Sequence, residues 1–223
     1  MGNSARYLFL FVSILPIGQS LAADIVIQSV NRSLTTTTNL GRIDEATTDL
    51  GTWEYEMDRF SPPYFAYADQ VSNIDFGRID IESHQRVGRS SDAPSPVRSG
   101  TSLDMIFQLN DQTEFELEWE WNVLVATLGT NSVFRVELVD LVSGDQIVWV
   151  QENVTYPLHH IDSDLISLPA GTYSFRATAG ATALSNEIRL HEFDYRVSMT
   201  VVPMPSVVSA SILCLLASQR RRR

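Results

Sequence analysis

The stretch that decides the fold is Glu114–Trp121, with the sequence EFELEWEW. Apolar and acidic residues alternate at every position. An extended chain therefore places the aromatic and leucine side chains on one side and four glutamates on the other. This period of two is typical of a strand in an antiparallel sheet that has one buried and one solvated face. The stretch predicts a β-strand whose outer face carries a row of carboxylates.

The same alternation recurs along the chain, while no stretch keeps a 3.6-residue apolar period over three turns. Ser143–Asp145 supplies a turn that predicts a hairpin between two such strands. The predicted strands are 103–109, 133–139, 146–150 and 192–199, a turn and strand over 168–177, and weaker strands at 24–28, 57–67 and 74–81. Ser90–Gly100 is rich in serine and proline, which predicts a long surface loop inside one domain. We therefore predict an all-β body over residues 23–201, an antiparallel β-sandwich of jelly-roll-like type.

The N-terminus has the pattern of a secretory signal peptide. Arg6 precedes the apolar stretch Tyr7–Ile17, and small residues follow up to Ala22. The apolar part is much shorter than the roughly 20 residues that span a bilayer. We predict a signal peptide over residues 1–22 that is cleaved after Ala22.

The C-terminus has three parts. A short motif (Val202, Pro203, Met204, Pro205, Ser206) precedes an apolar segment over 207–217 and an arginine cluster (Arg220, Arg221, Arg222, Arg223). A dozen apolar residues rise only about 18 Å as a helix, against a hydrocarbon core of about 30 Å. The arginines favour the cytoplasmic side of a membrane. These features predict transient membrane association through the tail, with the body outside.

This end, residues 202–223, resembles the PEP-CTERM sorting signal of secreted bacterial proteins. In that family Pro-Glu-Pro is the commonest core, and Met204 stands here where the glutamate would be. The resemblance implies that an exosortase recognises Val202–Ser206, cleaves near it and passes the body to the cell surface or extracellular matrix. The block from Leu103 to Met199 also resembles secreted PEP-CTERM proteins as a broad class, which implies a β-sandwich or jelly roll and no particular activity.

Composition excludes some partners. All 16 cationic residues are arginines, against 27 acids, and the formal net charge is −11. Because the chain ends carry Arg6 and the arginine cluster, the body is more acidic still, which argues against a nucleic-acid partner. Cys214, the only cysteine, lies in the tail, so the body has neither a disulfide nor a thiolate zinc site.

Glu116, Glu118 and Glu120 raise the question of catalysis. The stretch resembles the Glu-apolar-Asp-apolar-Glu strand of jelly-roll β-glucanases, which implies Glu116 as nucleophile and Glu120 as acid/base, with Glu118 in place of the central aspartate. On a regular strand, positions i and i+4 lie about 13 Å apart, beyond the roughly 5–9.5 Å of glycosidase carboxylate pairs, so a bulge would be required. We interpret the row as a solvated sheet face and predict no catalytic residues.

Two other groups have a functional and a structural interpretation. His160, Asp162 and Asp164 would share one side of an extended segment and could bind zinc or calcium; the alternative is a polar loop that leads into the strand at Leu168. We predict the loop, with no metal and no cofactor. Four aromatic residues would stack on sugar rings if exposed, or form part of the core if buried. They are Trp53, Tyr55, Tyr64 and Tyr67.

These features together predict a secreted cell-surface or extracellular-matrix protein of structural or binding role, sorted by an exosortase. The alternative is a carbohydrate-active protein, either a carbohydrate-binding module or a glucanase-like hydrolase that uses Glu116 and Glu120. The expected partners are the exosortase and, for a binding role, extracellular polysaccharide. We predict that the protein is not an enzyme.

Overall fold

A computed structural model of the chain describes residues 25–75, 77–89, 96–127, 129–154, 156–183 and 189–203. The predicted signal peptide, the motif residues Met204–Ser206 and the arginine cluster Arg220–Arg223 lie outside the described residues. Within these ranges, no helix is long and apolar enough to cross a membrane.

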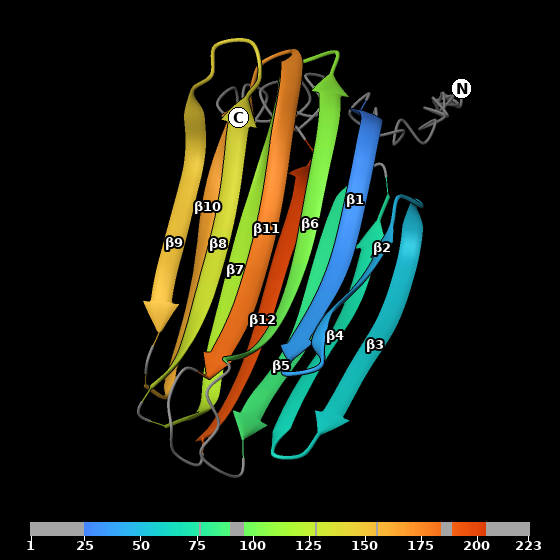
Figure 1. Ribbon diagram of the computed structural model, residues 1–223. Coiled ribbons are helices and arrows are strands. Elements are labelled where there is room, and N and C mark those ends of the chain that lie inside the picture. The colour runs from blue at the N-terminus through green and yellow to red at the C-terminus, as the bar shows by residue number, and fades with distance from the viewer. Residues whose placement is uncertain are drawn as a thin grey trace, which may run out of the picture.

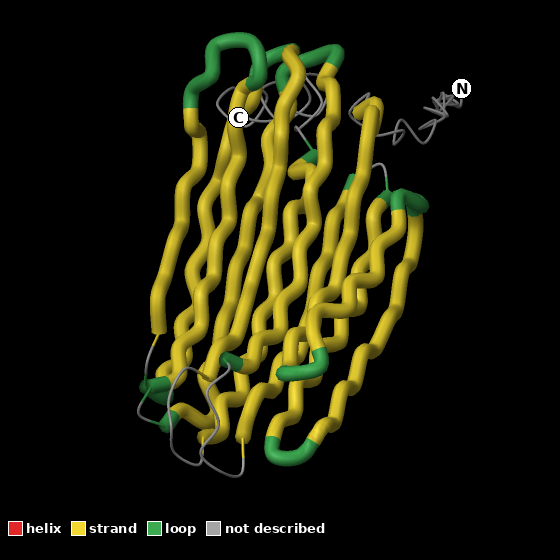
Figure 2. The backbone as a smooth tube through the Cα atoms, viewed as in Figure 1, coloured by secondary structure: helices red, strands yellow, loops and turns green. Residues whose placement is uncertain are grey.

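The described residues form twelve β-strands (Figure 1). In chain order they are β1 (Ile25–Thr38), β2 (Gly41–Thr47), β3 (Gly51–Ser61), β4 (Tyr64–Ile74), β5 (Arg78–Arg89), β6 (Val97–Leu109), β7 (Thr113–Ala126), β8 (Thr130–Asp140), β9 (Gln146–Val154), β10 (Leu158–Leu168), β11 (Gly171–Ala183) and β12 (Arg189–Val202). Figure 2 shows that short turns connect many of these long strands.

The strands form two antiparallel six-stranded sheets that pack face to face (Figures 1 and 2). Sheet A has the order β2-β1-β6-β11-β8-β9, and sheet B has the order β10-β7-β12-β5-β4-β3. Strands β5 to β12 form nested pairs, which are β8 with β9, β7 with β10, β6 with β11 and β5 with β12. Successive pairs alternate between sheet A and sheet B. This nesting is the jelly-roll arrangement. The predicted all-β antiparallel sandwich of jelly-roll type is therefore confirmed.

Strands β1 to β4 widen the jelly roll on one side. In sheet A, β1 pairs with β6 and β2 pairs with β1. In sheet B, β4 pairs with β5 and β3 pairs with β4. Each sheet therefore has six strands, four from the nested pairs and two from β1 to β4.

Several predicted boundaries were wrong. The predicted strand 57–67 is a hairpin, because the chain turns at Pro62–Pro63 between β3 and β4. The predicted strand 74–81 also contains a turn, in which the Asp75 carboxylate accepts hydrogen bonds from the N–H groups of Gly77 and Arg78. The predicted loop 90–100 ends early, since β6 begins at Val97. The predicted hairpin turn is confirmed, with Gly144 at φ 78°.

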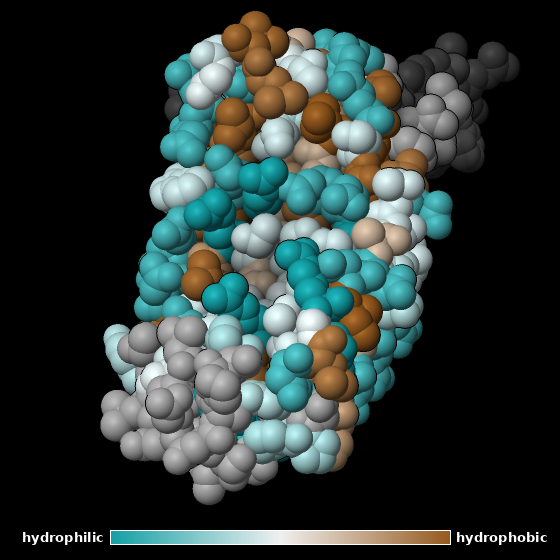
Figure 3. Space-filling model, viewed as in Figure 1, coloured by the Kyte–Doolittle hydropathy of each residue, from teal (hydrophilic) through white to brown (hydrophobic). Residues whose placement is uncertain are grey.

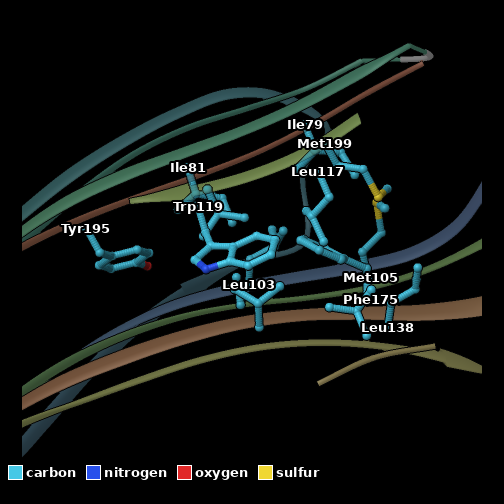
Figure 4. Close-up of a cluster of buried hydrophobic side chains, with 14 of the residues drawn as sticks. Ile79, Ile81, Leu103, Met105, Leu117, Trp119, Leu138, Phe175, Tyr195 and Met199 are labelled. Atoms are coloured by element: carbon cyan, nitrogen blue, oxygen red, sulfur yellow. The ribbon is translucent and has the colours of Figure 1, made fainter. Parts of the chain in front are cut away.

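The main core lies between the two sheets (Figure 4). Ile81, Leu117 and Trp119 extend from sheet B toward Leu103 and Phe175 of sheet A. All five side chains are buried, so the alternation of β7 places its aromatic side inside the sandwich. Burial of this apolar surface is the main force that holds the sheets together.

The interior between β1 and β4 is more polar. The Arg32 side chain, on β1, is fully buried and donates hydrogen bonds to the carbonyl oxygens of Gly51 (2.8 Å) and Ser72 (3.5 Å) on sheet B. Burial lowers the pKa of this guanidinium, and the nearby Asp49 carboxylate opposes the shift. Arg32 therefore links the two sheets through backbone carbonyls.

Candidate functional site

The glutamates of β7 lie on the outer face of sheet B, where β7 is flanked by β12 and β10. Glu118 lies opposite Ser198 of β12 and Ser163 of β10. In the next row, Glu120 lies opposite Arg196 of β12 and Ile161 of β10. The two serine side chains beside Glu118 are short, whereas Glu120, Arg196 and Ile161 in the next row have longer side chains. This difference leaves a depression in the face.

This depression, which we call the β7 hollow, has a volume of about 320 Å³. Its lining is Glu118, Trp119, Glu120, Ile161, Asp162, Ser163, Arg196 and Ser198, and all of these except Trp119 and Asp162 belong to the outward side of their strands. The hollow thus combines two carboxylates, one guanidinium, two hydroxyls and one apolar side chain on a hydrogen-bonded sheet. Because the floor is sheet backbone, these groups are held at fixed spacings.

Few interactions within the protein occupy these polar groups. The Ser198 hydroxyl donates to a Glu118 carboxylate oxygen at 3.3 Å. The Nε2 atom of His159 lies 2.8 Å from Glu120 Oε1. Arg196 is exposed and forms no ion pair within the described part of the chain, although Glu120 and Glu82 lie opposite it on the two neighbouring strands. The guanidinium is therefore available to an external ligand.

The structure does not bring Glu116 and Glu120 together. The register between β7 and β10 is continuous from Thr113 to Val123, and the only irregularity in the pairing of β7 with β12 lies beyond it. The bulge that a glucanase pair would require is absent from this part of β7, and the two residues stay about 13 Å apart along the strand. The β7 hollow includes Glu120 but not Glu116.

The predicted loop at His159–Asp164 is wrong, because these residues belong to the edge strand β10. His160, Asp162 and Asp164 do share one side, which faces the gap between the sheets but remains exposed. The His160 ring stacks on Trp121 with centroids 5.4 Å apart. No group of three or more His, Cys, Asp or Glu side chains in the described residues is arranged to hold a metal ion. Charges at such positions protect an exposed sheet edge from pairing with other chains.

The four candidate aromatic residues are not part of the β7 hollow. Tyr64 is buried in a small core cluster, and Tyr67 bonds to Asp69. Trp53 and Tyr55 stack with ring centroids 5.9 Å apart on the inward side of β3, where Trp53 packs against the core. Apolar contact in the hollow comes instead from Ile161, which is 64% exposed.

The outer face of sheet B also contains a histidine cluster that sequence reasoning missed. His84 of β5 bonds through Nδ1 to Asp194 of β12, and its Nε2 lies 3.4 Å from Glu192. From β4, the Asp69 carboxylate accepts hydrogen bonds from the backbone N–H of His84 (2.7 Å) and from the Tyr67 hydroxyl (2.8 Å). The hydrogen bond to Asp194 raises the pKa of His84, and partial burial opposes this shift. Hydrogen bonds and an ion pair of this cluster thus connect β4, β5 and β12.

The predicted sorting motif starts where the sandwich ends. Val202 is the last residue of β12 and lies opposite Glu114, and Pro203 follows the strand directly. Proline cannot donate the N–H that a further ladder bond requires.

Figure 3 shows the other side of the molecule, the outer face of sheet A. Hydrophilic side chains cover much of this view, and an apolar patch lies at its upper end, where β8 turns into β9. Val142, in this turn, is 83% exposed.

Comparison with known proteins gives no family. No family model matches the chain, and no curated protein matches it. Among solved structures, the enzymatically active domain of tailspike protein 4 from bacteriophage CBA120 is 10% identical, with a TM-score of 0.27 over 78% of this chain and 20% of that chain. The structure of infectious bursal disease virus Gt strain is 10% identical, with a TM-score of 0.28 over 79% of this chain and 56% of that chain.

A further similar structure is the isomalto-dextranase of Arthrobacter globiformis T6 in complex with panose. It is 12% identical, with a TM-score of 0.20 over 78% of this chain and 32% of that chain. The chain thus spans between about a fifth and just over half of the length of these three proteins.

Proposed function

We propose that this chain is an exosortase-sorted cell-surface or extracellular-matrix protein whose β-sandwich has a binding role, with extracellular polysaccharide as the ligand. The observation that carries the binding role is the β7 hollow, a solvated depression on a rigid sheet with an unpaired guanidinium beside carboxylates and hydroxyls. The export and sorting rest on the two chain ends.

The groups in the hollow match the chemistry of a sugar. Glu118 and Glu120 accept hydrogen bonds from sugar hydroxyls, Arg196 donates to sugar oxygens, and serine hydroxyls do both. Ile161 offers apolar contact to the C–H face of a pyranose ring. A few well-placed polar groups beside an apolar contact are typical of specific small-ligand sites.

The geometry supports binding and not hydrolysis. A glycosidase uses two carboxyl groups within about 9.5 Å of each other on opposite sides of the scissile bond. Glu116 and Glu120, the pair that the resemblance to glucanases implies, stay about 13 Å apart on a strand with no bulge between them.

Filling the hollow tests the binding role. We expect Ser163→Trp to abolish retention of the body on polysaccharide gels, because the new indole would occupy the space beside Glu118. Ser163 is exposed on the edge strand β10, so the fold tolerates the larger side chain. Retention is measured by affinity electrophoresis through gels that contain a panel of polysaccharides.

Ser167→Trp is the matched control, since Ser167 is exposed on the same face of β10 but outside the hollow. The control should be retained like the wild type. Equal retention of both variants, or no retention of the wild type on any polysaccharide, would contradict the proposed function.

The processing of the ends gives a separate prediction. We expect the mature protein extracted from the cell surface to begin near Ala23 and to lack Arg220–Arg223, because signal peptidase and exosortase each remove one end. Intact mass spectrometry measures both ends at once. A mass that includes the arginine cluster would contradict sorting by cleavage and leave a simple C-terminal anchor.

A further inference from the structure

Acidic side chains lie near the β7 hollow on β5, β7 and β12. Glu82 of β5 lies opposite Arg196, and Asp80 of β5 lies opposite Ser198. Glu116 precedes the hollow on β7, and Asp194 precedes it on β12. A ligand in the hollow is therefore exposed to negative potential from several directions.

Much of this negative charge has no partner in the protein. Asp80 pairs with Arg78 at 2.5 Å, and Asp194 bonds to His84. Glu82, Glu116 and Glu118, in contrast, form no ion pair within the described ranges. The hollow and the strands beside it thus carry carboxylates without an ion-pair partner among the described residues, near the guanidinium of Arg196.

The outer face of sheet A is different. Asp44 pairs there with Arg42 at 2.7 Å. Asp104 and Glu137 both lie beside Arg176. Because the acids on that face have arginine partners, the unpaired negative charge lies mainly on the outer face of sheet B, which contains the hollow.

We infer that the ligand of the hollow is an amino polysaccharide, a glycan that carries protonated amino groups. This inference rests on the proposed function. A sugar ammonium group donates charge-assisted hydrogen bonds to Glu118 and Glu120, which are stronger than those of a neutral hydroxyl. Arg196 binds ring or hydroxyl oxygens of the same chain. Glycans with uronate or sulfate groups are repelled by the same carboxylates.

The decisive experiment compares two probes that differ only in acetylation, a chitosan oligosaccharide and its fully N-acetylated counterpart of equal length. Titration calorimetry at about pH 6 measures the affinity of both probes under the same conditions. We expect the chitosan oligosaccharide to bind at least about tenfold more tightly to the mature body, with an affinity that falls as salt is added.

Two double variants separate the hollow from the general acidity of the body. Glu118→Gln with Glu120→Gln removes two charges inside the hollow. Glu54→Gln with Glu56→Gln removes two charges from exposed positions on β3, at the far edge of the same sheet. We expect the first pair to weaken chitosan binding at least about tenfold and the second pair to change it less than about twofold.

The outcomes are distinct. Equal affinity for the acetylated and the deacetylated probe would overturn the inference while leaving polysaccharide binding intact. Equal weakening by the two double variants would show diffuse attraction to an acidic protein and would also overturn it. Failure of the proposed function itself would appear in the gel assay, where the wild type would be retained on none of the polysaccharides.

Discussion

Replacing Trp119 by alanine is expected to lower the free energy of unfolding by about 3–5 kcal/mol. Trp119 is 7% exposed, and its indole lies between Ile81 of sheet B and Leu103 of sheet A (Figure 4). Removal of the ring leaves a cavity between two sheets that cannot close it, because each is held by its own hydrogen-bonded strands. Domains are stable by only about 5–15 kcal/mol, so much of the total is lost. Urea unfolding followed by far-UV circular dichroism measures the change.

Glu118→Gln provides the control on the adjacent residue. Glu118 is exposed on the opposite face of β7, so its replacement should change the free energy of unfolding by less than about 0.5 kcal/mol. An unchanged stability of Trp119→Ala, or an equal loss in both variants, would mean that the buried and exposed faces of β7 are assigned the wrong way round.

The fold was predictable where strands have one apolar and one polar face. In β7, Phe115, Leu117, Trp119 and Trp121 are all buried, and the glutamates between them face outward. The alternation visible in the sequence is therefore the alternation of the structure. Several strands with this pattern, without any helical period, were sufficient to predict an antiparallel sandwich.

The N-terminal strands were harder to predict, because their inward side is partly polar. Arg32, Gln70 and Gln85 are fully buried, yet a hydropathy pattern marks each of them as exposed. Hydrogen bonds inside the sandwich make this burial possible. Gln85 donates to the Thr101 hydroxyl at 3.2 Å, and Thr101 bonds to the Tyr195 hydroxyl at 2.7 Å. Such partners lie far apart in the sequence and are known only once the sheets are assembled.

The candidate site was predictable only in part, for a topological reason. The glutamate row of β7 is visible in the sequence, but the hollow also needs Ser163, Arg196 and Ser198. These residues come from β10 and β12, which flank β7 in the sheet although other strands separate them along the chain. The same reason hid His84, whose partners come from β4 and β12. Residue pairing across a jelly roll depends on strand order and register, which short sequence patterns do not contain.

A second large effect is expected from acid, through a histidine in the interior. His191 is fully buried at the start of β12, where its Nε2 bonds to the Ser132 hydroxyl and its Nδ1 has no partner among the described residues. Burial lowers the pKa of His191 to about 4, from an ordinary value of 6.5. The unfolded chain therefore takes up a proton below about pH 6.5, while the folded protein does so only near pH 4.

This difference in pKa makes the folded protein less stable in acid. Stability from the neutral imidazole is fully present above about pH 6.5 and is lost as the pH falls toward 4, at a limiting rate of about 1.4 kcal/mol per pH unit. We expect wild type to lose about 2–3 kcal/mol more than His191→Gln between about pH 7 and pH 4.5, since the variant has no imidazole to protonate. Urea unfolding of both proteins at each pH gives the difference, and titrations of the carboxylates cancel.

His84→Gln is the matched control, because it should show the opposite sign. The Asp194 hydrogen bond raises the pKa of His84, so this residue contributes stability that is fully present below its ordinary pKa and is lost as the pH rises through the raised value. As the pH falls, the free energy of unfolding of the wild type should thus rise relative to that of His84→Gln. Relative to that of His191→Gln, it should fall. A His191→Gln difference that stays constant from about pH 7 to pH 4.5 would mean that the buried imidazole gains a proton as easily as one in water.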